Sequence, residues 1–171
     1  MSRKTVLRWL MIPACGLLAA LCGCATMGFD SDKGTPMTYH VKRAPGPMTI
    51  DADWDKPEWK NAPVAELTHY MGDKPDHSPR TQARVMYDDQ ALYVIFRVED
   101  RYVVCQPREL NGSICCDSTC EFFFQPAQAP GYFNFEVNIA GALHASYITG
   151  TGTPSRRHEF ITPEEAAAMR I

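Results

Sequence analysis

The sequence predicts a mainly β fold, an antiparallel β-sandwich over residues 37–171. Apolar and polar side chains alternate with a period of two over residues 82–98, 118–124 and 132–139, as they do in half-buried strands. Helical signals are confined to residues 57–62 and to a short segment that begins at Thr162. Several short strands separated by turn residues are typical of a sandwich.

The first strand pair spans residues 82–98. Ala83 and Val85 fall on one side of the predicted strand before Asp88-Asp89-Gln90, and Val94 and Phe96 fall on one side of the predicted strand after it. Acidic residues at this position are typical of a hairpin turn, although a pair of aspartates could also bind Ca²⁺. We favour the turn.

The second strand pair, residues 118–124 and 132–139, predicts a sheet with two different faces. Phe133, Phe135, Val137 and Ile139 fall on one side and should enter the core. The opposite side collects the polar residues Glu121, Asn134, Glu136 and Asn138. Such a face is either a solvated surface or a binding surface.

Shorter elements complete the predicted sandwich. Further strands are expected at residues 38–41, 48–52, 64–71 and 143–148. Near residues 57–62 we expect one helical turn, with Trp54 and Trp59 covering the core rather than serving as binding platforms. Thr162, Pro163 and Glu165 form the capping box of a C-terminal helix.

Size and charge exclude several classes of protein. A chain of 171 residues with a net charge of -3 suffices for one ordinary domain and lacks the clustered cations of a nucleic-acid binder. No G-x-S-x-G, P-loop or dinucleotide fingerprint occurs, and the histidines show no metal-ligand spacing. We therefore expect a non-catalytic protein with neither a metal site nor a cofactor.

Residues 1–23 have the pattern of an export signal. Basic residues precede an apolar run over residues 9–21, which is too short to span a membrane. Leu21-Cys22-Gly23-Cys24 resembles the bacterial lipobox, so Cys24 is the predicted lipidation site; an ordinary secretory signal or a retained anchor is the alternative. Residues 24–36 would be a tether, and the cell envelope the location.

Four cysteines remain in the expected exported domain: Cys105, Cys115, Cys116 and Cys120. In an oxidising compartment they allow three sets of two disulfides. We favour one structural bridge, from Cys105 to Cys115 or Cys116.

Four segments, in this order, resemble one family: IDADWDKPEWKNAP at 50–63, TQARVMYDDQALYVIFRVED at 81–100, DSTCEFFFQP at 117–126 and YFNFEVNIAG at 132–141. They are similar to family 9 carbohydrate-binding modules and their DOMON-like relatives. The resemblance implies a β-sandwich that binds oligo- or polysaccharide and is exported beside glycoside hydrolases that degrade plant polysaccharides.

The resemblance also implies roles for individual residues. It gives Glu121 and Asn138 contacts to sugar hydroxyls, with Asn134 and Glu136 beside them. It would place a stacking Trp near Ile114 and an Arg at Glu136, and neither is present, so we expect modest affinity. It further implies closing strands after residue 171, so we expect a C-terminally truncated sandwich; a smaller sandwich closed by the residues present is the alternative.

DOMON-like relatives supply a second functional hypothesis. On the same fold the chain could hold haem or act in electron transfer, with a methionine such as Met71 or Met86 and a histidine as axial ligands. Direct hydrolysis of glycans is a third, weaker reading. It would need two carboxylates at a defined separation across the sugar, which the sequence alone does not show for Asp117 and Glu121.

Overall fold

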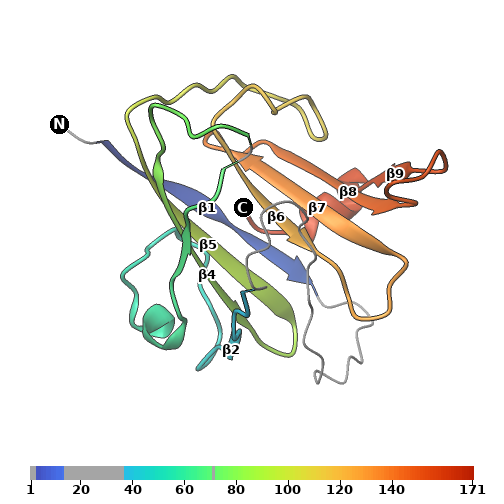
Figure 1. Cartoon of the computed structure of the whole chain (residues 1–171). Helices are drawn as coiled ribbons and strands as arrows, with labels where there is room; N and C mark the ends of the chain where they lie inside the picture. Colours follow the sequence, from blue (N-terminus) through green and yellow to red (C-terminus); the bar gives the residue numbers. More distant parts are fainter. Residues whose placement is uncertain (1–2, 14–36, 71) are drawn as a thin grey trace.

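The structure is a computed structural model that describes residues 3–13, 37–70 and 72–171, with side chains from residue 37 onward. Two β-sheets pack face to face (Figure 1). The predicted mainly β sandwich is therefore confirmed. Among the described residues, no helix combines the length and apolar character needed to cross a membrane.

The first sheet has the strand order β1-β5-β4-β2, and β3 also pairs with β4. Its pairings are antiparallel except for β2 with β4. The Asp88 carboxylate closes the β4–β5 turn by accepting hydrogen bonds from the N–H groups of Gln90 and Ala91 at 2.7 and 2.9 Å. The structure therefore agrees with the prediction that Asp88 and Asp89 form a hairpin turn. The strands are β1 (Arg3–Pro13), β2 (Lys42–Arg43), β3 (Ala65–Leu67), β4 (Arg80–Tyr87) and β5 (Ala91–Asp100).

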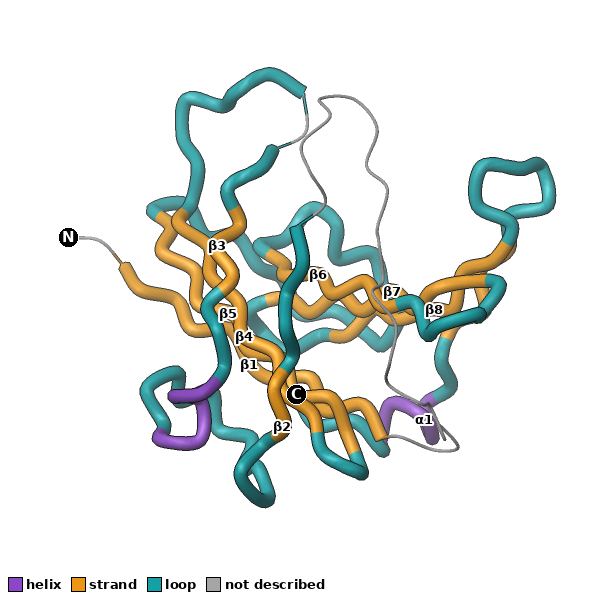
Figure 2. The backbone as a smooth tube through the Cα atoms, turned by 60° about the horizontal axis from the view of Figure 1, so that its bottom comes forward, coloured by secondary structure: helices purple, strands orange, loops and turns teal. Residues whose placement is uncertain are grey.

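The second sheet has the order β6-β7-β8-β9, and its strands follow one another along the chain. Each pair is antiparallel, and the predicted β6–β7 hairpin is present. The loop after β8 projects away from the body of the molecule (Figures 1 and 2). The strands are β6 (Thr119–Phe124), β7 (Gly131–Asn138), β8 (Leu143–Thr149) and β9 (Arg157–Phe160).

Apolar side chains of the two sheets meet in the interior. Ala83, Val94 and Phe96 of the first sheet are buried against Cys120 and Phe122 of the second. The two-residue repeat of a strand assigns these residues to the inner faces. The predicted parity, meaning which residues of each hairpin point inward and which outward, is therefore confirmed.

The rest of the inner face of the second sheet is covered by the C-terminal segment. Phe135 and Val137 are buried against Ala166, Met169 and Ile171. Helix α1 (Pro163–Ala167) begins with the predicted capping box, in which the Thr162 side chain accepts from the Glu165 N–H and the Glu165 side chain accepts from the Thr162 N–H.

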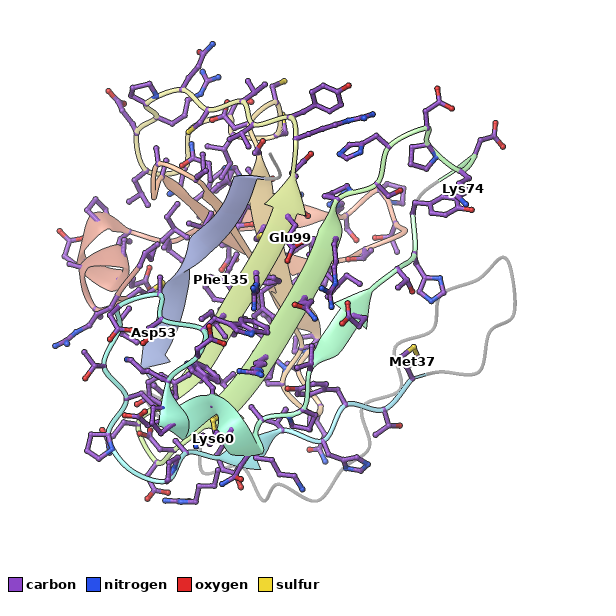
Figure 3. The ribbon with its side chains drawn as sticks, turned by 90° about the vertical axis from the view of Figure 1, so that its left-hand side faces the viewer. Met37, Asp53, Lys60, Lys74, Glu99 and Phe135 are labelled. Carbon is purple, nitrogen blue, oxygen red and sulfur yellow. The ribbon has the colours of Figure 1, made fainter. Side chains whose placement is uncertain are left out.

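The outer face of the first sheet is buried as well. Residues 44–62, which include the 3-10 helix η1 (Pro57–Asn61), lie across β4 and β5, as the segment carrying Asp53 and Lys60 shows in Figure 3. Trp54 and Trp59 pack there with Met86, Tyr93 and Ile95. Both tryptophans are core residues, as the sequence predicted.

Four short segments differ from expectation. Residues 38–41 are not a strand, and pairing with β4 begins only at β2. Residues 48–52 are not a strand because the chain bends at Asp51 and Ala52 has a positive φ of 56°. The expected strand at 64–71 is limited to β3. Strand β9 was not predicted, since no alternation marks residues 157–160.

Residues 3–13 form β1, antiparallel to β5 at the edge of the first sheet. These residues belong to the predicted signal, so cleavage after residue 23 would remove this strand and expose the edge of β5. The predicted lipidation site Cys24, the predicted tether at 24–36 and Met71 lie outside the described residues.

Candidate functional site

The outward face of the second sheet, called here the polar face, brings together residues from four strands in two rows. One row runs across β6, β7 and β8 through Glu121, Glu136 and His144, which are direct partners in the antiparallel register. The next row crosses all four strands through Phe123, Asn134, Ser146 and Phe160. Residues that are opposite one another in a sheet have neighbouring side chains on one face.

The first row, called here the carboxylate row, places two carboxylates side by side. The Glu136 Oε1 atom accepts a hydrogen bond of 2.7 Å from the Asn134 amide. Partial burial and the neighbouring Glu136 raise the pKa of Glu121, and His144 acts in the opposite direction. Glu121 remains accessible to solvent. The pair therefore offers strong hydrogen-bond acceptors to a ligand rich in hydroxyl groups.

The second row, called here the aromatic row, has an aromatic residue at each end and polar residues at its centre. Phe123 is 41% exposed and Phe160 is 53% exposed, whereas Asn134 and Ser146 between them are 7% and 0% exposed. The Asn134 Oδ1 and Ser146 Oγ atoms are buried and make no hydrogen bond with any other described residue. Three strand spacings separate the two phenylalanines, roughly 14 Å along the sheet.

Unpartnered polar atoms are uncommon inside proteins because burying them without a hydrogen bond costs free energy. Here two of them are neighbours in the register, beside the carboxylate row. This hydrogen-bonding capacity is not used within the described part of the chain, so it points to a ligand.

His144 is held in place from two sides. Its Nδ1 atom lies 3.1 Å from the Gly112 carbonyl oxygen, and its ring packs edge-on against Phe160 with 5.3 Å between the ring centroids. The Nδ1 atom is thus occupied, and the imidazole joins the carboxylate row to the aromatic row.

Asn138 has a different role from the one its family resemblance implies. It is 1% exposed. Its amide donates to Asp117 Oδ2 at 2.9 Å and to the Gln106 carbonyl, and its oxygen accepts from the N–H groups of Ala140 and Ala142. All of its hydrogen-bonding groups are engaged within the protein, so Asn138 positions the β7–β8 turn and the loop before β6.

Asp117 is the anchor of that loop. Its side chain is 1% exposed and lies 3.6 Å from Arg108. The hydrogen bond from Asn138 and the nearby Arg108 guanidinium hold the pKa of Asp117 below its usual value, against desolvation. Asp117 is therefore tied to the scaffold through Asn138 and Arg108, and it lines the same cavity as Glu121.

The four cysteines occupy two different environments. Cys120 packs in the sandwich interior, and its burial raises the pKa of the thiol to about 12. Cys115 and Cys116 are exposed, and Cys105 is partly exposed. None of the four is bonded to another in the structure.

A cavity of about 420 Å³ opens beside the polar face, between the two sheets. Its lining includes Phe96, Val98, Tyr102 and Glu121. Tyr102 is 62% exposed. Glu121 therefore borders both the polar face and this cavity, and it can serve a ligand in either place.

Met86 and the aspartate pair Asp88 and Asp89, proposed for haem and calcium, lie away from the polar face. Met86 is fully buried and packs with Trp54, Trp59 and Tyr93. The carboxylate of Asp88 is engaged in its turn and with the Tyr93 hydroxyl at 2.7 Å, and Asp89 pairs with Arg43. In the described part of the chain, no group of three or more potential ligand side chains is arranged around a metal position.

Sequence reasoning placed Glu121, Asn134 and Glu136 on one face and missed four of its members: Phe123, His144, Ser146 and Phe160. The same parity that exposes Glu121 also exposes Phe123, so that residue could have been found. The residues of β8 and β9 required the register across their turns, which alternation within a strand does not supply.

Comparison with known proteins identifies the domain. The family model described as carbohydrate-binding family 9 matches residues 56–164, a span that includes the carboxylate row and the aromatic row. No curated protein and no solved structure matches the chain significantly. The chain therefore belongs to carbohydrate-binding family 9, whose domains are non-catalytic modules that imply binding of a carbohydrate.

Proposed function

We propose that the polar face of the second sheet is the carbohydrate-binding surface, and that it takes an oligosaccharide from plant cell-wall polysaccharide. The observation that carries this proposal is the second row, in which Phe123 and Phe160 flank the buried, unpartnered oxygens of Asn134 and Ser146. Aromatic side chains with polar groups between them suit a sugar, which has apolar ring faces and equatorial hydroxyls.

Each group on the face has a part in this binding mode. Glu121 and Glu136 accept hydrogen bonds from sugar hydroxyls, and charge-assisted bonds of this kind contribute about 1.5–3 kcal/mol each. Phe123 and Phe160 contact the apolar faces of two sugar units. Both rings are phenyl groups rather than the larger indole, so the affinity is modest, at best sub-millimolar.

The wider biological role follows from the N-terminal sequence and the family. The basic start, the apolar run and Gly23-Cys24 support export with a lipid on Cys24, at the cell envelope. A module anchored in this way would hold polysaccharide fragments near glycoside hydrolases. Labelling cells with a fatty-acid analogue tests the anchor: label on the wild type and none on Cys24→Ala is expected, and label that persists in the variant contradicts it.

Titration calorimetry with xylo- and cello-oligosaccharides tests the binding face. We expect Glu121→Gln to weaken binding about tenfold, because the neutral amide replaces a charged acceptor. Ser146→Ala should weaken binding less while leaving the fold intact, because it removes a hydroxyl that makes no hydrogen bond inside the described protein.

A matched pair of aromatic variants distinguishes the polar face from the neighbouring cavity. Phe160→Ala should weaken binding, and Tyr102→Ala, which removes an exposed ring beside the cavity, should not. The reverse result would place the sugar in the cavity. Equal affinity of the wild type, Glu121→Gln and Phe160→Ala would show that the sugar binds at another surface.

A further inference from the structure

We propose that Cys115 and Cys116 form a disulfide with each other in the exported protein, and that this bridged pair is an apolar subsite for a sugar ring at the border of the polar face. The inference rests on the proposed carbohydrate binding and adds one subsite to it.

The two cysteines occupy the tip of a turn whose ends are held firmly. The Asp117 N–H donates to the Ile114 carbonyl oxygen at 2.9 Å, which places Cys115 and Cys116 at the two central positions of a β-turn. Ile114 is 1% exposed, and Asp117 is bound by Asn138. The backbone is thus anchored on both sides while both sulfur-bearing side chains are exposed.

The loop that carries this turn borders the carboxylate row. Gly112 contacts His144 on β8 through its carbonyl oxygen at 3.1 Å, and Asp117 contacts Asn138 on β7 at 2.9 Å. The chain between these contacts spans two neighbouring strands of the second sheet. Cys115 is close enough to Glu136 for the carboxylate to act electrostatically on its thiol.

The environment favours a bond within this pair. Cys120 faces the core on the opposite side of the sheet, so its buried thiol is not accessible to the two exposed cysteines. The Ser113 hydroxyl lies 3.4 Å from the Cys115 sulfur. Hydrogen bonds with Ser113 and Cys116 lower the pKa of Cys115, against the nearby charge of Glu136. These hydrogen bonds favour the thiolate form of Cys115, which is the nucleophile in disulfide exchange.

The bond forms by thiol–disulfide exchange with an oxidised dithiol protein of the cell envelope. The Cys115 thiolate attacks one sulfur of the donor disulfide, forms a mixed disulfide and releases the other donor sulfur as a thiolate. The Cys116 thiolate then attacks Cys115 and releases the second donor sulfur. The two cysteines are oxidised by two electrons, the donor is reduced to its dithiol, and their two protons pass to solvent or to the donor.

Oxidation changes what the turn presents to a ligand. Two weakly polar thiols lose their hydrogens and become one compact apolar surface. Ile114 beside the pair is buried, so the bridged pair is the apolar group that this turn would expose to a ligand. Consecutive Cα atoms are about 3.8 Å apart, closer than in most disulfides, so the bond is strained and reducible by mild reductants.

Mass spectrometry of the full chain purified from the cell envelope tests the bond. Free thiols are blocked with N-ethylmaleimide before digestion with trypsin and an Asp-directed protease. Trypsin separates residues 102–108, which contain Cys105, from residues 109–156, and cleavage before Asp117 then removes Cys120. We expect an unlabelled 109–116 peptide that is lighter than its reduced form by two hydrogens.

Calorimetry with and without a phosphine reductant tests the subsite. Reduction should weaken sugar binding about fivefold, as expected for loss of one good apolar contact. Cys115→Ser should bind like the reduced protein and ignore the reductant. Cys105→Ser, the matched control in the same loop, should behave like the wild type.

Two results would overturn this inference alone and leave the proposed function unaffected. One is a bridge from Cys105 to either partner, seen as a link between peptides 102–108 and 109–116. The other is sugar binding that is weakened by Glu121→Gln but is unchanged by the reductant and by Cys115→Ser. That result would not contradict the proposed function. Absence of sugar binding in both redox states would instead contradict the proposed function, and this subsite with it.

Discussion

The two outer faces of the sandwich are built in opposite ways. On the first sheet, residues 44–62 cover the strands, and Trp59 and Met86 are fully buried. On the second sheet the polar face keeps Phe123 and Phe160 exposed, with paired carboxylates and two unpartnered oxygens. One face contributes to stability, and we propose that the other retains its hydrogen-bonding groups for a ligand, although both are outer faces of one domain.

The two faces should differ most in what the loss of one aromatic ring costs. Trp59→Ala should lower the free energy of unfolding by about 3–5 kcal/mol, because it removes a fully buried ring and leaves a cavity. Phe160→Ala on the polar face, where the ring is 53% exposed, should cost about 1 kcal/mol or less. Urea denaturation of both variants measures the difference. Similar losses would show that the polar face is part of the stabilising core.

A second pair of variants distinguishes residues that stabilise the second sheet from residues that bind the ligand. Asn138→Ala should lower the free energy of unfolding by about 2–3 kcal/mol, because it leaves a buried carboxylate and two turn N–H groups without their partner. Ser146→Ala should change stability by less than about 1 kcal/mol. Denaturation and calorimetry on the same samples check this. Loss of sugar affinity in Asn138→Ala with unchanged stability would show that Asn138 contacts the sugar.

The smallest expected effect is a pH dependence at the carboxylate row. The pKa of Glu121 is raised above the ordinary value of 4.5 by partial burial and by Glu136. Its ionised form is thus disfavoured in the folded state, and stability falls as pH rises from about 4.5 through the raised pKa. Glu121→Gln should therefore melt slightly above the wild type at pH 7, and the difference should vanish below about pH 4.

Thermal melts at several pH values between 4 and 8 measure this effect. A Glu121→Gln variant that melts lower than the wild type at pH 7 would show that the ionised carboxylate stabilises the fold. The paired carboxylates would then be a structural feature of the polar face rather than an arrangement maintained for a ligand.

The predictions from sequence succeeded where an interaction is local. Alternation placed Phe135 inside and Glu136 outside, and the capping residues Thr162 and Glu165 marked the start of α1. They failed where the partner is distant. Strand β9 has four exposed residues and no alternation, and it is a strand because β8 offers it an edge.

The candidate site divides in the same way. Parity along β6 and β7 is enough to bring Glu121, Asn134 and Glu136 to one face of the sheet. It could not distinguish Asn138, which shares their parity yet is enclosed by the loop that carries Asp117. Whether a polar side chain is exposed depends on what covers it, and the covering segment lies 21 residues away in the sequence.

Local sequence is sufficient to specify the mainly β class, the two hairpins and the inward or outward side of each residue, because these depend on the two-residue repeat of a strand and on short turns. Which outward residues meet is a property of the folded chain. Register across four strands created the aromatic row, the fold of residues 44–62 sealed the first sheet, and the loop before β6 engaged Asn138 while it left Glu121 accessible. These outcomes arise from contacts between segments far apart in the chain, and a repeat within one strand carries no information about them.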